Sequence, residues 1–73
     1  METRSVKSRF GSRLRNLRDE RGYSQEELAE RAGLHRNYVG GVERGERNVA
    51  LENIVKLAKA LSVSPKDLFA DFG

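Results

Sequence analysis

Apolar residues spaced three and four positions apart, interrupted by glycine at short intervals, limit the folds open to this chain. From Val6 to Arg21 they fall on one helix face, and Gly22 follows where a left-handed residue commonly ends a helix. Gly33 and Gly45 close the next two segments in the same way. No segment alternates as a strand does, so we expect an all-α fold of short helices.

Five helices are predicted from these patterns and from the capping residues. Ser24-Gln25-Glu26-Glu27 has the spacing of a capping box, in which the serine oxygen accepts from the Glu27 amide and the Glu27 carboxylate reaches back. Ser64-Pro65 supplies an N-cap and a first-turn proline for a fifth helix ending near Ala70. The predicted ranges are 6–21, 24–32, 35–44, 51–61 and 65–70. The apolar residues that define the first and fourth are Val6, Phe10, Leu14 and Leu17, and Leu51, Ile54, Val55, Ala58 and Leu61.

Size and composition restrict the functions open to the chain. Its 73 residues make one domain, 1–73, with a core over about 6–70, too small for a deep active-site cleft. With no cysteine and one histidine, we expect no disulfide, no metal site and no cofactor. The acids are dispersed and no glycine-rich phosphate loop follows a strand, so an enzyme is not expected. No membrane span or signal peptide is visible, which favours a soluble, cytoplasmic protein.

Positive charge is concentrated at the N-terminus. The net charge is +3, and residues 1–21 hold seven Lys and Arg against three acids. Such a bias indicates a polyanion partner, although a solvated basic face without a partner is the alternative.

The second and third predicted helices are joined by a short turn containing Gly33, which is the arrangement of a helix-turn-helix. The second helix of such a pair can lie in the DNA major groove. On a helical wheel, Val39 and Val42 mark the buried side of the third helix. The opposite side carries Arg36, Asn37, Gly40, Gly41 and Arg44.

Adjacent glycines within a helix are costly, about 1 kcal/mol each relative to alanine. We expect Gly40 and Gly41 to face outward, where the missing Cβ atoms let another surface come close. Arg36 can then contact guanine, and Asn37 an adenine edge or a phosphate. The alternative is that the arginines are ordinary solvated side chains and the glycines meet a neighbouring helix.

The stretch YSQEELAERAGLHRNYVGGVERGERNVALENIVKLAKALSVSPKDLF resembles the phage-repressor-type helix-turn-helix family, the Cro/cI or Xre class. The resemblance covers about residues 10–69. It rests on Ser-Gln opening the second helix, Leu-Ala before Gly33, and Glu-Arg-Gly ending the third helix. The short chain and HRNYVGGVERGERN look most like restriction-modification controller proteins, which are small dimeric regulators of transcription.

The resemblance implies a role for each matching position. Arg36 and Asn37 match the base-reading residues, while Arg18 and Glu43 match a structural ion pair. Tyr38 could touch a phosphate or pack its ring over the second helix. The residues implied to contact the DNA backbone or to let it approach are Ser24, Gln25, His35, Tyr38, Gly40, Gly41, Arg44, Arg47 and Asn48.

The chain departs from the family pattern at two helix starts. Ala50 stands where a Ser or Thr usually caps the fourth helix, and His35 replaces a stronger cap on the third. His35 is therefore either a weak cap or a phosphate contact.

The expected function is a sequence-specific transcriptional regulator that binds double-stranded DNA as a homodimer. Phe69 and Phe72 follow a core that Leu57, Leu61, Val63 and Leu68 complete, so part of this aromatic surface is predicted to form the dimer interface. The alternative is an antitoxin or protein-interaction module with the same fold. RNA polymerase is a further candidate partner, through the acidic edge of Glu26, Glu27 and Glu30.

Overall fold

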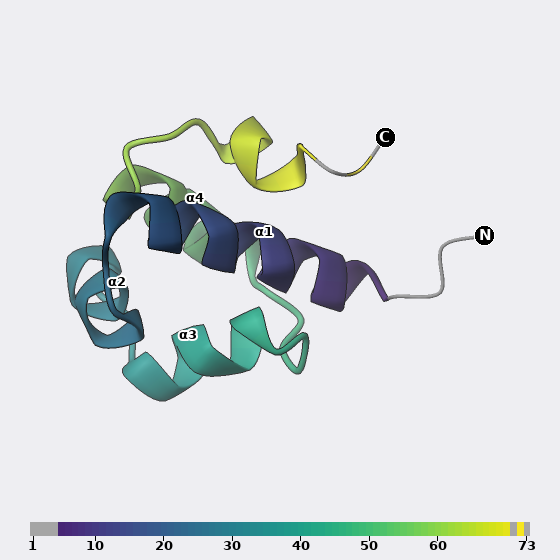
Figure 1. The fold of residues 1–73 in the computed structure, drawn as a ribbon. Coiled ribbons are helices and arrows are strands. Elements are labelled where there is room, and N and C mark those ends of the chain that lie inside the picture. The colour runs from purple at the N-terminus through teal and green to yellow at the C-terminus, as the bar shows by residue number, and fades with distance from the viewer. Residues whose placement is uncertain (1–4, 71, 73) are drawn as a thin grey trace.

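The computed structural model describes residues 5–70 and 72, which form four α-helices and one 3-10 helix (Figure 1). The described residues contain no strand, so the all-α prediction is confirmed. The elements are α1 (Val6–Arg21), α2 (Gln25–Ala32), α3 (Arg36–Glu43), α4 (Leu51–Ala60) and the 3-10 helix η1 (Pro65–Phe69).

The prediction of a fifth α-helix is wrong, because η1 is a 3-10 helix of five residues. Its first turn is closed by a bond from the Asp67 amide to the Ser64 carbonyl, 2.9 Å, which is the tighter i to i+3 pattern. Ser64 is the N-cap residue as predicted, and the Asp67 carboxylate accepts from the Ser64 amide at 3.0 Å. A segment of five residues could form very few of the i to i+4 hydrogen bonds of an α-helix, so it gains little from α-helical geometry.

The helix ends follow the capping residues. Gly22 and Gly33 have φ values of 73° and 70°, the left-handed conformation expected after α1 and α2. Ser24 accepts from the Glu27 amide at 3.0 Å. The Glu27 carboxylate was predicted to reach back and complete the capping box. It pairs instead with Arg31, at 3.1 Å.

The core lies where the four helices and η1 meet. α3 packs against α1 and α2, α4 packs against α2, and η1 packs against α1 and α4. In Figure 1, α3 and η1 lie on opposite sides of α1. The largest fully buried side chains are Leu14, Leu28, Val39, Val42, Leu57, Leu61 and Leu68.

Three residues of the predicted apolar pattern lie outside this core. Val6 is 64% exposed, Leu51 77% and Val55 41%. The buried residues of α4 are Leu57 and Ala58, of which Ala58 belongs to the predicted pattern. The helix was therefore predicted correctly, and its buried face only in part.

A close backbone approach between α1 and α3 was not foreseen. Gly11 is buried, and a Cβ atom built on it would lie 2.7 Å from the carbonyl oxygen of Glu43. It would also collide with the carbonyl oxygen of Val42. Glycine at position 11 therefore allows the C-terminal end of α3 to rest directly on α1.

The uncapped start of α4 provides a stability prediction. Ala50 is the N-cap residue and makes no side-chain cap bond. Ala50→Ser should raise the free energy of unfolding by about 1 kcal/mol, because the hydroxyl would satisfy an amide that alanine leaves to water. Urea denaturation measures this change. Ala50→Val, which cannot cap, is the control and should give no gain. An unchanged midpoint for the serine variant would contradict the prediction.

Candidate nucleic-acid interface

The turn between α2 and α3 is held by local bonds. The Leu34 amide donates to the Ala29 carbonyl at 2.8 Å, which closes the end of α2. His35 is the N-cap of α3, and its Nδ1 atom accepts from the Asn37 amide at 3.1 Å. In the structure His35 therefore acts as a cap, which was one of its two predicted roles. α3 follows α2 after only three residues, with its first turn on the surface.

Arg36 and Asn37 form that exposed first turn. Both residues are exposed, and neither side chain makes a hydrogen bond or ion pair within the part of the chain that the structure describes. A guanidinium and an amide side by side supply the donors and acceptors that pair with guanine and adenine edges. These side chains are free to meet a ligand without breaking an internal contact.

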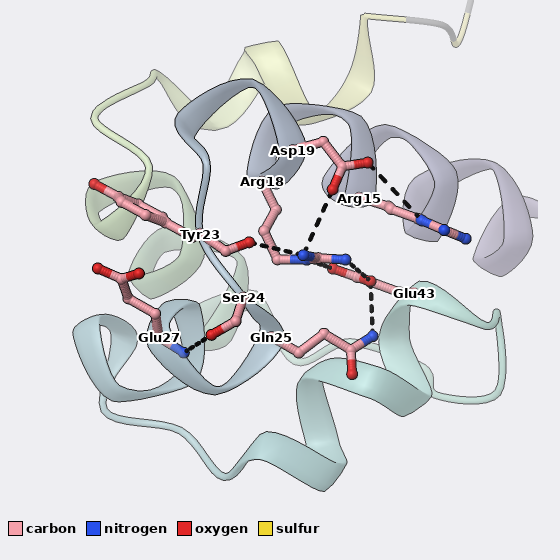
Figure 2. Close-up of polar contacts among 8 residues, drawn as sticks. All are labelled: Arg15, Arg18, Asp19, Tyr23, Ser24, Gln25, Glu27 and Glu43. Atoms are coloured by element: carbon pink, nitrogen blue, oxygen red, sulfur yellow. Dashed lines mark hydrogen bonds and ion pairs between the residues drawn. The ribbon is translucent and has the colours of Figure 1, made fainter.

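A network of polar contacts fixes the other end of α3 (Figure 2). The Nε atom of Arg18 lies 2.7 Å from one Glu43 oxygen, and the Nη2 atom of Arg18 lies 3.1 Å from the other. Arg18 also donates to the Tyr23 carbonyl at 2.8 Å, and the Gln25 amide donates to Glu43 at 2.9 Å. Figure 2 shows these side chains meeting between α1, α2 and α3. One carboxylate thus joins three helices.

The Arg18–Glu43 pair is shielded from water. The Glu43 side chain is 3% exposed and that of Arg18 12%. The hydrogen bond to Glu43 raises the pKa of Arg18, an effect that burial partly opposes. Arg18 therefore stays charged opposite the Glu43 carboxylate.

Gly40 and Gly41 face away from the core as expected, but they are not bare, because side chains cover them and both residues are buried. A Cβ atom on Gly40 would lie 3.1 Å from Nη1 of Arg44 and 3.3 Å from Oε1 of Gln25. A Cβ atom on Gly41 would lie 3.1 Å from Cγ of Arg47. Because neither glycine has a side chain, the long polar side chains of Gln25, Arg44 and Arg47 lie close against α3 at these positions. The two glycines therefore face these side chains and face neither the hydrophobic core nor open solvent.

Arg44 and Arg47 lie over the C-terminal half of α3 with different partners. The Nε atom of Arg44 is 3.1 Å from the Glu46 carboxylate, and both side chains are exposed. The guanidinium of Arg47 lies 5.6 Å from the centre of the Tyr38 ring. Asn48 is exposed in the connection to α4. All three residues therefore follow the C-terminal end of α3.

Tyr38 was expected either to touch a phosphate or to pack its ring over α2, and in the structure its hydroxyl contacts α4. Its hydroxyl accepts from the Asn53 side chain of α4 at 3.1 Å, and the residue is half-buried against the core. The sequence could not predict the contact between Tyr38 and Asn53, because fifteen residues separate them in the chain. The hydroxyl is thus held near the start of α4 rather than free at the surface.

Phe69 and Phe72 belong to an aromatic cluster with Phe10. The ring centres of Phe10 and Phe69 are 5.3 Å apart, and those of Phe69 and Phe72 are 5.5 Å apart. Arg9 covers the Phe72 ring at 4.5 Å. Phe69 remains 39% exposed, so part of this surface is open to a partner.

The sequence profile of the helix-turn-helix family matches residues 14–68, which include the whole of α2, the turn and α3. The chain belongs to the helix-turn-helix family. The resemblance to this family in its Xre form is confirmed, and three similar proteins confirm the resemblance to controller proteins.

Named relatives and solved structures agree with this assignment. Control protein C.BamHI from Bacillus amyloliquefaciens is 48% identical over 67 residues, covering 90% of this chain and 83% of the relative. Control protein C.SmaI from Serratia marcescens is 46% identical over 68 residues, covering 93% and 81%. The crystal structure of the restriction-modification controller protein C.AhdI from Aeromonas hydrophila has a TM-score of 0.86 and 60% identity. It covers 86% of this chain and 96% of that one.

The buried glycines of this helix-turn-helix provide a second prediction. Gly41→Ala should raise the free energy of unfolding by up to about 1 kcal/mol, because alanine favours helix and only the flexible Arg47 side chain must move. DNA affinity should fall, since Arg47 is displaced. Gly11→Ala is the contrasting variant and should destabilise by about 1–3 kcal/mol, because its Cβ meets backbone. Thermal melting and DNA titration measure both effects. Equal destabilisation by the two variants would contradict the prediction.

None of the described helices is both long and apolar enough to cross a bilayer.

Proposed function

We propose that this helix-turn-helix regulator binds double-stranded DNA as a homodimer at a two-fold symmetric operator, with α3 in the major groove. The observation that carries the proposal is the pair of exposed, unengaged side chains of Arg36 and Asn37 at the start of α3. The braced Glu43 end holds the helix in one orientation, which base recognition requires. Arg36 pairs with guanine, and Asn37 with an adenine edge or a phosphate.

Phosphate contacts are proposed for residues at the N-termini of α2 and α3 and at the C-terminal end of α3. The N-terminus of α2, with Ser24 and Gln25, and that of α3, with His35, present helix amides that favour an anion. Arg44, Arg47 and Asn48 lie at the other end of α3 and reach the backbone there. Tyr38 contributes at the flank. These contacts set the register of the protein on DNA, while the first turn of α3 reads the bases.

The regulatory role that fits best is that of a controller protein. The names of the similar proteins describe control proteins and a restriction-modification controller. We infer that the chain occupies a promoter and represses it, with activation through contact with RNA polymerase as the variant mechanism. Glu26 and Glu30 line a shallow hollow beside Leu34, which provides a surface for such a contact.

Footprinting on the DNA that flanks the gene of this protein tests the proposal. We expect one protected region with two symmetric half-sites about 34 Å apart, bound by two chains. Sedimentation of the complex measures the stoichiometry. Arg36→Ala should lose protection, whereas the exposed α1 variant Glu20→Ala should keep it. Capture of a protein partner from DNA-free lysate, with no specific DNA site found, would support the antitoxin or interaction-module alternative instead.

A further inference from the structure

The Tyr38 hydroxyl takes part in one hydrogen bond with a described residue, and it is the acceptor in that bond. The Nδ2 atom of Asn53, in the first turn of α4, donates to it at 3.1 Å. A phenol oxygen both accepts hydrogen bonds and donates its own hydrogen. None of the residues that the structure describes accepts the hydrogen of Tyr38. The hydroxyl therefore keeps a donor for a ligand.

Asn53 sets the direction of this donor. Two hydrogens pointed at each other repel, so the hydroxyl hydrogen turns away from the N–H group of Asn53. The core behind Tyr38 offers no acceptor side chain, because no polar or charged residue is buried in the described part of the chain. The hydrogen therefore faces the surface. Accepting a bond from Asn53 also polarises the O–H group and strengthens it as a donor.

Arg47 lies beside the same ring. Its guanidinium is 5.6 Å from the centre of the Tyr38 ring, and its Nε atom would lie 3.2 Å from a Cβ atom on Gly41. Arg47 forms no ion pair with any described residue. A positive charge and a neutral donor thus lie together on one flank of α3. An anionic oxygen accepts strongly from both kinds of group.

We propose that Asn53 is a positioning residue for DNA binding, which holds the Tyr38 hydroxyl so that its hydrogen points at a backbone phosphate that Arg47 also contacts. Asn53 does not touch the phosphate itself. The partner is a phosphate rather than a base, because a phosphate oxygen offers only acceptors and both Tyr38 and Arg47 present donors. The inference rests on the proposed DNA binding and adds a residue of α4 to it.

A double-mutant cycle tests the positioning role. Tyr38→Phe should weaken operator binding by about tenfold, because a charge-assisted hydrogen bond is lost. Asn53→Ala should weaken it by about threefold to tenfold, because the hydroxyl loses its fixed direction. The two changes together should bind like Tyr38→Phe alone, since Asn53 acts through that hydroxyl. Asn16→Ala, an exposed asparagine on α1, is the matched control and should bind like the parent.

Fluorescence anisotropy with a labelled operator measures these affinities over a range of salt concentrations, and thermal melting establishes that each variant is folded at the assay temperature. Tyr38 is a neutral donor and releases no counterion, so Asn53→Ala and Tyr38→Phe should keep the salt slope of the parent. Arg47→Ala should reduce the slope by about one per subunit.

Operators with one uncharged methylphosphonate at a time locate the phosphate. Asn53→Ala, Tyr38→Phe and Arg47→Ala should lose their effects at the same phosphate of each half-site. A purely structural role of Asn53 would instead leave its effect unchanged at every phosphate and would overturn the inference.

The remaining outcomes separate this inference from the proposed function. A parent chain without a specific DNA site would overturn the proposed function and the inference with it. A parent that binds its operator while Asn53→Ala binds equally well would overturn the inference alone. Equal weakening by Asn53→Ala with and without Tyr38→Phe would show that Asn53 does not act through Tyr38, and would likewise overturn it.

Discussion

Glu43→Ala should lower the free energy of unfolding by about 3–5 kcal/mol, because it leaves the largely buried Arg18 guanidinium with only the exposed Asp19 carboxylate nearby. The same change removes the acceptor of the Gln25 amide. Small domains are stable by only about 5–15 kcal/mol, so much of the variant should be unfolded under mild denaturing conditions. Urea denaturation followed by circular dichroism measures the loss of stability.

The control for this prediction is Glu46→Ala. Glu46 also pairs with an arginine, but both side chains are 59% exposed, so its removal should cost less than about 1 kcal/mol. Combining Arg18→Ala with Glu43→Ala should cost clearly less than the sum of the single changes, since the first removes the charge that the second strands. A Glu43 variant no less stable than the Glu46 variant would show that the network does not support the fold.

Arg36→Ala should weaken operator binding by roughly 1–3 kcal/mol for each guanine that the guanidinium pairs with, and it should flatten discrimination at one position of each half-site. Arg36 is exposed and makes no described internal contact, so the stability of the fold should stay unchanged. Titration against operators with single base changes measures the discrimination. A thermal melt establishes that the variant is folded.

Arg47→Ala is the paired comparison. Arg47 lies beyond α3, over Gly41 and Tyr38, and its proposed contact is a phosphate. Its removal should weaken binding to all DNA sequences about equally and reduce the salt dependence by about one counterion per subunit. Uniform weakening by both variants, with equal changes in salt slope, would make Arg36 a phosphate contact. Base recognition would then pass to Asn37 or to DNA shape.

Helix positions could be predicted from the sequence because their signals are local. Gly22, Gly33 and Ser24 each act on amides or carbonyls within one turn, so α1 ends, and α2 begins and ends, close to where these residues place the boundaries. The fifth segment shows the limit of such signals. A cap and a proline mark where a helix starts, but they do not decide whether five residues adopt α or 3-10 geometry.

The candidate site was predicted where its members are neighbours in the chain. Arg36 and Asn37 share one exposed turn, and helical periodicity alone places them opposite Val39 and Val42. The Arg18–Glu43 pair came only from the resemblance to the family, because the two residues are 25 positions apart. No pattern within the chain indicates that their charges meet.

From the sequence alone one could predict that the chain is helical, where most of its helices begin and end, and that the first turn of α3 is exposed. What covers each helix face is visible only in the folded chain. A helical wheel places Gly40 and Gly41 opposite the core, but it cannot show that Arg44, Gln25 and Arg47 lie over them. In the same way, Leu51 and Val55 continue an apolar pattern and still lie outside the core. Periodicity depends on bonds within one helix, whereas burial depends on side chains that arrive from distant segments.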